Sequence, residues 1–350
     1  MMQVVLPSHS ALQYMGRIDR NNPDAPAFYW AGSMVRFGFY GKQLCVTLTD
    51  YRAYGDPVIG YILDGVEGKL TLSKDTNIPQ TVWIPVESDG AHECILFKRQ
   101  DATHYFVLNE ISLAENGAVF SLPALPQRRI ECYGDSVSAG AVCEAYDYTG
   151  KTDPPVYDAA LDNAWHSYAM QTARLLGAQI HLTAQGGIAL LDDTGYFEYG
   201  KIGMETAYHQ MAYVPFAPAS EWDFSRYTPD VVLFAIGQND HHVGEKDNCI
   251  PDDKKKEVWL QTYCSLIRDL MQKYPKATFV LLLTILMHDP FWDGLLDEAC
   301  ALLNSPRVKR FRFHRCGVGT PGHPRIQEQC EMACELTEYL LSFGEPLWNH

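Results

Sequence analysis

The stretch Arg129-Ile130-Glu131-Cys132-Tyr133-Gly134-Asp135-Ser136 decides how the second half of this 350-residue chain should fold. Its first five residues have the character of a strand, and the mostly small residues 137–141 follow it. A serine at the turn where a strand ends can expose its hydroxyl and its backbone N–H together. An acyl-transfer nucleophile with an oxyanion hole needs both groups. Ser136 is therefore a candidate nucleophile.

Around this stretch, strand-like runs alternate with helical patterns from about residue 125 onward. We expect strands at 130–133, 179–183, 231–236, 279–286 and 310–314, and helices at 158–176, 252–274 and 324–343. Such alternation predicts a doubly wound α/β domain with a parallel sheet. Because binding sites in these sheets form at the carboxyl ends of the strands, Ser136 lies where a site is expected.

The first third of the chain reads as β structure. Short strand-like runs, separated by Asp-Gly and Asn-Gly turns, cover 34–40, 44–49, 58–63, 70–72, 81–86, 94–98 and 105–113. This spacing predicts an antiparallel β-sandwich of the jelly-roll kind. Prolines 123 and 126 make a short, stiff connection, so we expect two domains, 1–124 and 125–350.

Composition excludes several classes of partner. The formal charge is −15, from 28 basic and 43 acidic residues, and no basic stripe is evident, which argues against nucleic-acid binding. The longest apolar run, near residues 279–287, is too short to span a membrane. The N-terminal residues lack a secretory signal pattern, and the ten widely spaced cysteines read as reduced thiols, so we expect a cytoplasmic protein. Composition does not set the oligomeric state.

Three further stretches follow expected strands or precede an expected helix. The second strand ends in Gln185-Gly186-Gly187, where a glycine lets a backbone N–H approach a ligand closely. The third strand runs into Gly237-Gln238-Asn239-Asp240, which can aim the Asn239 amide into the same crevice as Ser136. His323 directly precedes Pro324, which suits the first position of the last helix.

In this order, the four stretches resemble the four sequence blocks of the SGNH (GDSL) hydrolase superfamily, over about residues 127–350. The N-terminal Gly16-Arg17-Ile18-Asp19, with residues 28–33 and 39–41, resembles the front module of carbohydrate esterase family 2. That family joins a jelly roll to an SGNH domain and removes acetyl groups from hemicellulose sugars. The resemblance implies a flavodoxin-like α/β/α catalytic domain and a serine acetyl esterase, acting without a cofactor on acetylated oligosaccharides of the xylan or mannan type.

The resemblance also implies roles for the candidate residues. Ser136 would attack the acetyl carbonyl, and His323 would take its proton and later give it to the sugar hydroxyl. The oxyanion would be held by the Ser136 N–H, by the N–H of Gly186 or Gly187, and by the Asn239 amide. Sequence does not choose between the two glycines.

The group that orients His323 is less clear from sequence. Many superfamily members have an Asp two or three residues before the histidine, where this chain has Pro321 and Thr320. We therefore predict a Ser–His dyad, with the imidazole oriented by a main-chain carbonyl near these residues. The alternative is a carboxylate from elsewhere in the chain.

Two residues are predicted to contact the sugar. Trp292, in Asp289-Pro290-Phe291-Trp292 after the fourth strand, is the expected sugar platform. His241 is expected at the rim, next to His242. These histidines lack the ligand spacing of a zinc site, so we predict no metal.

Two other functions compete with the acetyl esterase. The same serine chemistry could act on a lipid, a thioester or another small acyl ester. Alternatively, the chain is a carbohydrate-binding protein with an inert hydrolase domain, although the joint presence of Ser136, Asn239 and His323 argues against this.

Overall fold

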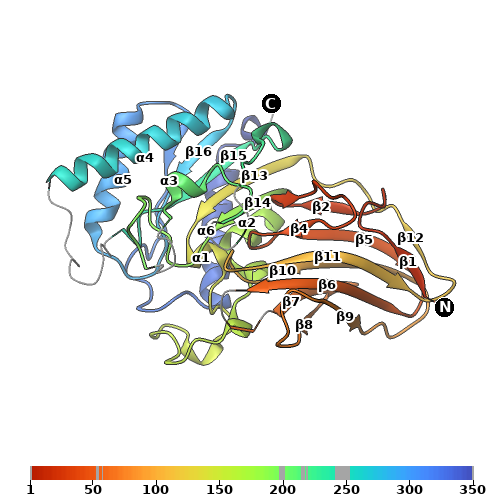
Figure 1. Ribbon diagram of the computed structural model, residues 1–350. Helices are drawn as coiled ribbons and strands as arrows, with labels where there is room; N and C mark the ends of the chain where they lie inside the picture. The colour runs from red at the N-terminus through yellow and green to blue at the C-terminus, as the bar shows by residue number, and fades with distance from the viewer. Residues whose placement is uncertain are drawn as a thin grey trace.

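The computed structural model describes residues 2–52, 55–56, 58–196, 202–213, 217, 220–240 and 253–348. A β-sandwich formed by the first third of the chain packs beside an α/β domain formed by the remainder (Figure 1). The predicted fold class, a jelly roll followed by a flavodoxin-like domain with a parallel sheet, is confirmed. No described helix combines the length and the apolar character needed to cross a membrane.

The sandwich consists of two antiparallel sheets of six strands each. One sheet has the order β3-β4-β11-β6-β9 with β1 beside β11, and the other has the order β12-β5-β10-β7-β8 with β2 beside β5. From β4 to β11 the chain passes back and forth between the sheets in the manner of a jelly roll, except that β7 and β8 are neighbours in one sheet. The strands are β1 (Gln3–Val5), β2 (Gln13–Met15), β3 (Ile18–Asp19), β4 (Ala27–Phe28), β5 (Met34–Tyr40), β6 (Leu44–Arg52), β7 (Val58–Leu63), β8 (Val66–Thr71), β9 (Pro79–Ile84), β10 (Ala91–Lys98), β11 (His104–Leu113) and β12 (Ala118–Phe120).

Alternating side chains build the core between these two sheets. In β5, the fully buried Val35, Phe37 and Phe39 alternate with the more exposed Arg36 and Tyr40. Because successive side chains of a strand point to opposite faces, this pattern fixes which face of β5 is turned inward.

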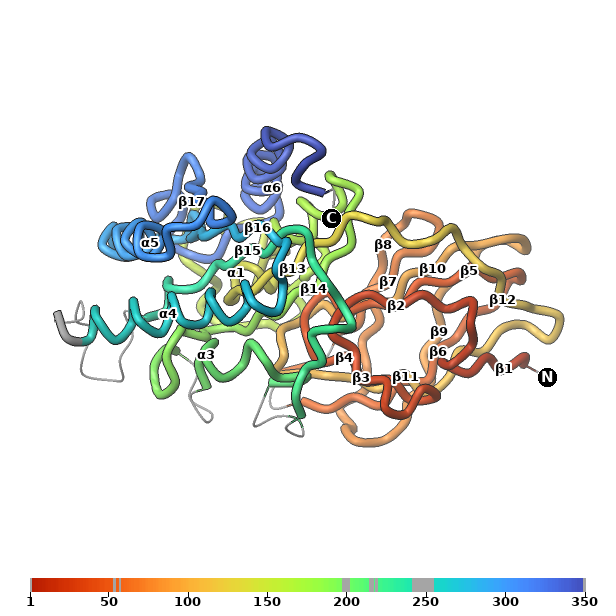
Figure 2. Tube along the Cα trace, turned by 90° about the horizontal axis from the view of Figure 1, so that it is seen from above, coloured from red at the N-terminus to blue at the C-terminus, as the bar shows by residue number. Residues whose placement is uncertain are grey.

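The second domain is built on five parallel strands in the order β14-β13-β15-β16-β17. This is the 2-1-3-4-5 order of flavodoxin-like sheets. The helices α2 and α6 pack on one face, and α4 and α5 pack on the other. Figure 2 shows α6 and α4 on opposite sides of the sheet. The elements are β13 (Arg128–Gly134), β14 (Ala178–Ala184), β15 (Val231–Ala235), β16 (Thr278–Leu281), β17 (Val308–Arg310), α1 (Ser136–Ala139), α2 (Tyr168–Leu175), α3 (Met204–Ala207), α4 (Asp253–Lys273), α5 (Pro290–Leu303) and α6 (Ile326–Leu341).

Several element boundaries differ from the prediction. The helix expected at 158–176 begins only at Tyr168, after two 3₁₀ turns. Asp158, Asn163 and Ser167 each accept a hydrogen bond from a backbone N–H two or three residues later. Side chains of this type compete for the backbone hydrogen bonds of a continuous helix. Each of the three therefore caps a new helical segment, and a single long helix does not form.

The later part of the domain differs as well. α5 was not among the expected helices, although Asp289 caps it and Pro290 occupies its first turn, which is an ordinary start signal. β16 ends at Leu281 rather than at 286, and β17 overlaps the expected strand 310–314 only at Arg310.

A buried ion pair joins the two domains. The Arg17 guanidinium reaches from the jelly roll to Glu131 of β13, with 2.9 Å between Nη2 and Oε1, and both side chains are fully buried. The same guanidinium donates to the Tyr133 hydroxyl and to the carbonyl of Tyr208, each within 2.8 Å. Removing one partner would leave a desolvated charge without compensation.

We therefore expect Glu131→Gln to lower the free energy of unfolding by about 3–5 kcal/mol, measured by urea denaturation. The matched control is Glu93→Gln, which breaks the partly exposed pair of Arg36 and Glu93 at 2.6 Å. That change should cost less than about 1 kcal/mol. Equal losses in both variants would contradict the assignment of the Arg17–Glu131 pair as a joint between the domains.

Candidate active site

The carboxyl ends of β13, β14 and β15 open into a cleft of about 540 Å³. This volume lies in the range of small-molecule sites. The lining includes the predicted Ser136, Gly186, Gly187, Asn239 and His323, together with Asp153. The structure thus brings together all the residues predicted to take part in the chemistry.

Ser136 is the first residue of the short helix α1, directly after β13. The Asp135 carboxylate caps this helix by accepting the Val137 N–H at 2.9 Å. Burial raises the pKa of Asp135 to about 6, which is consistent with a bracing group enclosed beneath the serine.

His323 links the serine to a carboxylate. Its Nε2 lies 2.7 Å from Ser136 Oγ, and its Nδ1 lies 2.6 Å from Asp153 Oδ2. Asp153 Oδ1 accepts the backbone N–H of His323 and a bond from Arg325 Nη2, each at 2.9 Å. This arrangement is that of a Ser–His–Asp triad.

The predicted dyad is therefore wrong, and the alternative of a carboxylate from elsewhere holds. Asp153 lies 170 residues before the histidine, so no spacing near His323 could reveal it. The one local signal was that Asp153 is followed by Pro154 and Pro155, which stiffen the loop. In the structure, Gly322 sits so close that a Cβ there would come within 2.7 Å of the Asp153 backbone nitrogen.

The surroundings of Asp153 keep it ionised. Burial raises its pKa, but the hydrogen bonds and charge of His323 and the hydrogen bond from Arg325 outweigh burial and hold the pKa well below the usual range for an aspartate. A carboxylate that stays charged can fix the imidazole tautomer and stabilise the imidazolium that forms during proton transfer.

The predicted oxyanion donors also reach the cleft. Asn239 Nδ2 donates one hydrogen to the Ile188 carbonyl at 2.9 Å, which fixes the amide plane beside the cleft. Asp240 accepts bonds from the Leu190 N–H at 2.9 Å and from the Trp259 indole at 2.8 Å. Burial raises the pKa of Asp240 to about 7. Asp240 thus braces the loop that carries Asn239.

The two candidate glycines differ in their hydrogen bonding. The Gly186 N–H donates to Asp101 Oδ2 at 2.9 Å, and Asp101 belongs to the jelly roll. Gly187 has a φ of +71°, and its N–H has no acceptor among the described residues. The jelly roll therefore contributes to the cleft as well as supporting the second domain.

Comparisons with known proteins agree with this geometry. Residues 14–123 match the family model "Carbohydrate esterase 2 N-terminal". The chain is 28% identical over 349 residues to an acetylxylan esterase / glucomannan deacetylase of Cellvibrio japonicus, covering 96% of this chain and 90% of that protein. A solved family two carbohydrate esterase from Cellvibrio japonicus superposes with a TM-score of 0.83 at 26% identity, over 99% of both chains.

This chain is a relative of the family 2 carbohydrate esterases. The predicted resemblance is thereby confirmed, and the predicted class of carboxylic ester hydrolase agrees with the names of these proteins. A second curated relative is the cellulase/esterase CelE of Acetivibrio thermocellus, 28% identical over 268 residues. The match covers 75% of this chain, which spans only about 30% of the length of CelE.

The predicted role of Trp292 as the sugar platform is wrong. Trp292 is 1% exposed and packs in the core against Trp259, with 5.8 Å between ring centroids. Pro290 starts α5, and the first turn of that helix directs Trp292 toward α4 rather than toward the cleft. His241, the predicted rim residue, lies outside the described residues. The exposed large aromatic or apolar side chains that line the cleft are instead Tyr157, Tyr196 and Met287.

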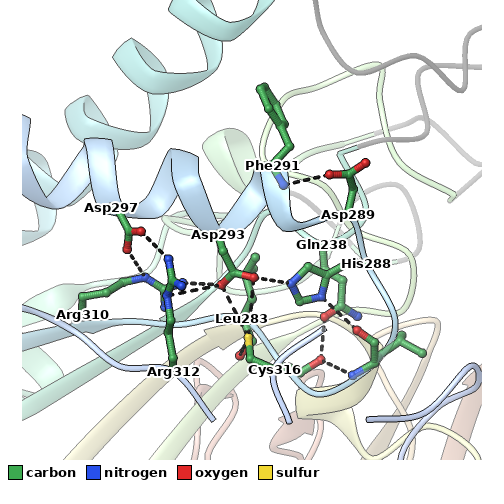
Figure 3. Close-up of polar contacts among 12 residues, drawn as sticks. Gln238, Leu283, His288, Asp289, Phe291, Asp293, Asp297, Arg310, Arg312 and Cys316 are labelled. Carbon is green, nitrogen blue, oxygen red and sulfur yellow. Dashed lines mark hydrogen bonds and ion pairs between the residues drawn. The ribbon is translucent and has the colours of Figure 1, made fainter. Parts of the chain in front are cut away.

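A cluster beside the cleft offers atoms of the metal-binding type. His288, Asp293 and Cys316 place potential ligand atoms within 4.8 Å of one another (Figure 3). His288 Nε2 lies 2.9 Å from Asp293 Oδ2, while the Arg310 guanidinium contacts Asp293 Oδ1. Burial, together with Asp293, raises the pKa of the Cys316 thiol to about 12.

The donor set of this cluster does not suit a metal, because a sulfur ligand must be a thiolate and the carboxylate is already paired with a cation. We interpret it as an ion-pair network that joins α5 to the segment before His323. The His288 N–H donates to the Gly317 carbonyl at 3.2 Å, and the Met287 N–H donates to Thr320 at 2.8 Å. The network thus supports the loop that carries the base.

The triad gives a direct prediction. Asp153→Asn should lower kcat by about 10⁴-fold, as the corresponding change does in other triads, because the imidazole loses its orienting carboxylate. KM should change little. The measurement is steady-state turnover of 4-nitrophenyl acetate.

The matched control is Asp147→Asn, because Asp147 is an exposed aspartate in the segment just before Asp153. This variant should retain wild-type kcat. If Asp153→Asn also retained wild-type kcat, the catalytic unit would be a dyad after all.

Proposed function

We propose that this chain is a carbohydrate acetyl esterase that removes O-acetyl groups from hemicellulose-derived oligosaccharides of the xylan or mannan type through a serine acyl-enzyme. The observation that carries this proposal is the relay from Asp153 through His323 to Ser136, open to a cleft. The relative from Cellvibrio japonicus, named for acetylxylan and glucomannan, supports the choice of substrate class.

The geometry supports a two-step reaction. Ser136 Oγ attacks the acetyl carbonyl while its proton passes to His323 Nε2, which lies 2.7 Å from Oγ. The tetrahedral intermediate collapses, His323 gives the proton to the departing sugar oxygen, and the acetyl group stays on Ser136. A water molecule, deprotonated by the same imidazole, then attacks the acyl-enzyme. The ester bond to Ser136 breaks, the imidazolium returns the proton to Ser136 Oγ, and the acetyl group leaves as acetic acid, which ionises to acetate. The Asn239 amide and backbone N–H groups at the cleft stabilise the oxyanion, and each donor typically contributes 10²–10³ in rate.

The lining of the cleft favours a sugar over a lipid. Asp162, Gln238 and Asn239 place a carboxylate and two amide groups in the lining. A long acyl chain would leave such polar groups desolvated without compensation, whereas sugar hydroxyls can hydrogen bond in a polar site. The assembled triad argues against an inert hydrolase domain.

The rim offers a surface for the sugar ring. Tyr157, Tyr196 and Met287 are 49%, 48% and 59% exposed and line the cleft. Flat aromatic rings combine a large apolar face with a polar tip, which suits the apolar face and the hydroxyl edge of a pyranose. We assign the platform role to this group in place of Trp292.

The proposed chemistry predicts that Ser136→Ala lowers the rate of acetate release from acetylated xylo- and manno-oligosaccharides by at least about 10³-fold. The release is measured by mass spectrometry. His323→Ala should show a similar loss. Undiminished release by Ser136→Ala would end the serine mechanism. Preference for long-chain acyl esters over acetylated oligosaccharides would support the lipid alternative instead.

The proposed platform predicts that Tyr196→Ala raises KM for an acetylated xylo-oligosaccharide by roughly 3- to 10-fold, reflecting about 1 kcal/mol of lost ring contact. KM for 4-nitrophenyl acetate, which has no sugar, should not change. The matched control is Tyr40→Ala, because Tyr40 is 51% exposed but lies outside the lining of the cleft. Equal effects of Tyr196→Ala on both substrates would rule out a sugar platform.

A further inference from the structure

The connection between β10 and β11 carries an unusual density of buried polar side chains. Five polar residues among 98–104 are buried, each at 3% exposure or less: Lys98, Arg99, Gln100, Thr103 and His104. Burying polar groups is costly unless they are hydrogen bonded. A segment of this kind in the jelly roll therefore needs a dense set of partners, and the second domain supplies part of that set.

Contacts of the two residues before Asp101 fasten the connection to the second domain. Arg99 Nη2 lies 2.9 Å from Glu144 Oε1, and the Arg99 carbonyl accepts the Ala164 N–H at 2.8 Å. Gln100 Nε2 donates to the Ala159 carbonyl at 3.2 Å. The bonds of the Arg99 carbonyl and of the Gln100 amide hold the backbone beside Asp101 at a fixed position relative to the cleft, whereas the Arg99–Glu144 ion pair only joins the two domains.

The Asp101 carboxylate is fully occupied by protein donors. Its Oδ1 accepts both the backbone N–H and the hydroxyl of Thr103. Its Oδ2 accepts Gln185 Nε2 at 2.8 Å and the Gly186 N–H at 2.9 Å. A carboxylate offers about four acceptor sites, and here all four are used. Although Asp101 lines the cleft, it has no site left for a sugar hydroxyl.

The Gln185–Gly186 peptide lies between this carboxylate and the nucleophile. A Cβ built on Gly186 would come 2.6 Å from Asp101 Oδ2 and 4.0 Å from Ser136 Cβ. The bond to Asp101 commits the Gly186 N–H, whereas the neighbouring Gly187 N–H has no acceptor within the described part of the chain.

We propose that Asp101 of the jelly roll is a positioning residue for the oxyanion hole. It fixes the Gln185–Gly186 peptide and leaves the Gly187 N–H to serve the oxyanion. The jelly roll is then a part of the catalytic centre. This inference rests on the serine esterase function proposed above and names a further residue on which that function depends.

The role predicts a particular kinetic signature. A preorganised donor acts on the charge that develops in the transition state, so loosening it lowers kcat with little effect on KM. In Asp101→Asn, an NH₂ group replaces one of the two carboxylate oxygens, so the two donors that bond this oxygen in the wild type would face another donor. We expect kcat for 4-nitrophenyl acetate to fall by about 10- to 100-fold, less than for outright removal of a donor. Affinity for a small alkylboronic acid, which forms a tetrahedral anion on the serine, should fall in parallel.

The matched control is Glu144→Gln. Glu144 is another carboxylate at the interface of the two domains, where it binds Arg99, and it is not part of the lining of the cleft. If Asp101 only helped the domains to dock, both variants would lower the thermal midpoint and kcat together. We expect Glu144→Gln to keep kcat within about twofold of wild type, whatever its midpoint.

A second variant tests the same contact from the other side. Gly186→Ala retains its own N–H but pushes a methyl group against Asp101 Oδ2, so it should show the same loss of kcat and of boronate affinity. This variant decides the matter if Asp101→Asn does not fold.

Three results would overturn the inference: wild-type kcat in Asp101→Asn, equal losses in Asp101→Asn and Glu144→Gln, or a rise in kcat when Asp101 is neutralised. A rise would mean that Asp101 blocks a Gly186 donor instead of positioning the loop. Ser136→Ala separates this inference from the proposed function. If Ser136→Ala is inactive while Asp101→Asn is fully active, only the role of Asp101 fails.

Discussion

The hydrogen bond between Asp153 and His323 is the interaction on which the catalytic geometry depends. It holds the imidazole with one nitrogen toward a carboxylate and the other toward Ser136. Neither residue lies on a strand or inside a helix, so regular backbone bonding does not fix them. Arg325, fully buried at the start of α6, compensates by binding both the Asp153 carboxylate and the His323 carbonyl. A buried guanidinium thus turns two loops into one rigid unit.

The rest of the cleft is organised on the same principle, with carboxylates that hold backbone N–H groups. Asp135 holds the turn of Ser136, Asp240 holds the loop of Asn239, and Asp101 holds Gly186. Charge-assisted bonds of this kind are stronger than neutral ones and are directional. They suit an enzyme whose transition state must find its donors already in place. The common cost is desolvation, which raises the pKa of both Asp135 and Asp240.

The relation between the two domains follows from these buried charges. Arg17 with Glu131, and Arg99 with Glu144, cross the interface as ion pairs whose arginine side chains are almost wholly buried. Such pairs contribute little net stability compared with apolar packing, but the loss of one partner strongly destabilises the folded protein. The interface therefore specifies one relative placement of the jelly roll. That placement brings Asp101 to the cleft, which gives a physical reason for the jelly roll and the esterase domain to occur together in one chain.

The sequence by itself determined the β-sandwich, the parallel sheet and the place of the proposed catalytic groups. Alternation in β5 and the strand-then-glycine pattern at Ser136 are local features, and parallel strands necessarily bring their carboxyl ends to one edge. Ser136, Asn239 and His323 could be placed together for that reason. Only the tertiary structure decided the group behind His323, the state of the two glycines and the orientation of Trp292. Asp153 is 170 residues from its histidine and Asp101 is 85 residues from its glycine, so their contacts depend on how loops and domains pack. Trp292 points into the core because the core that a helix covers sets which side of the helix faces inward. Since α5 was not predicted, the sequence could not show which side Trp292 would face.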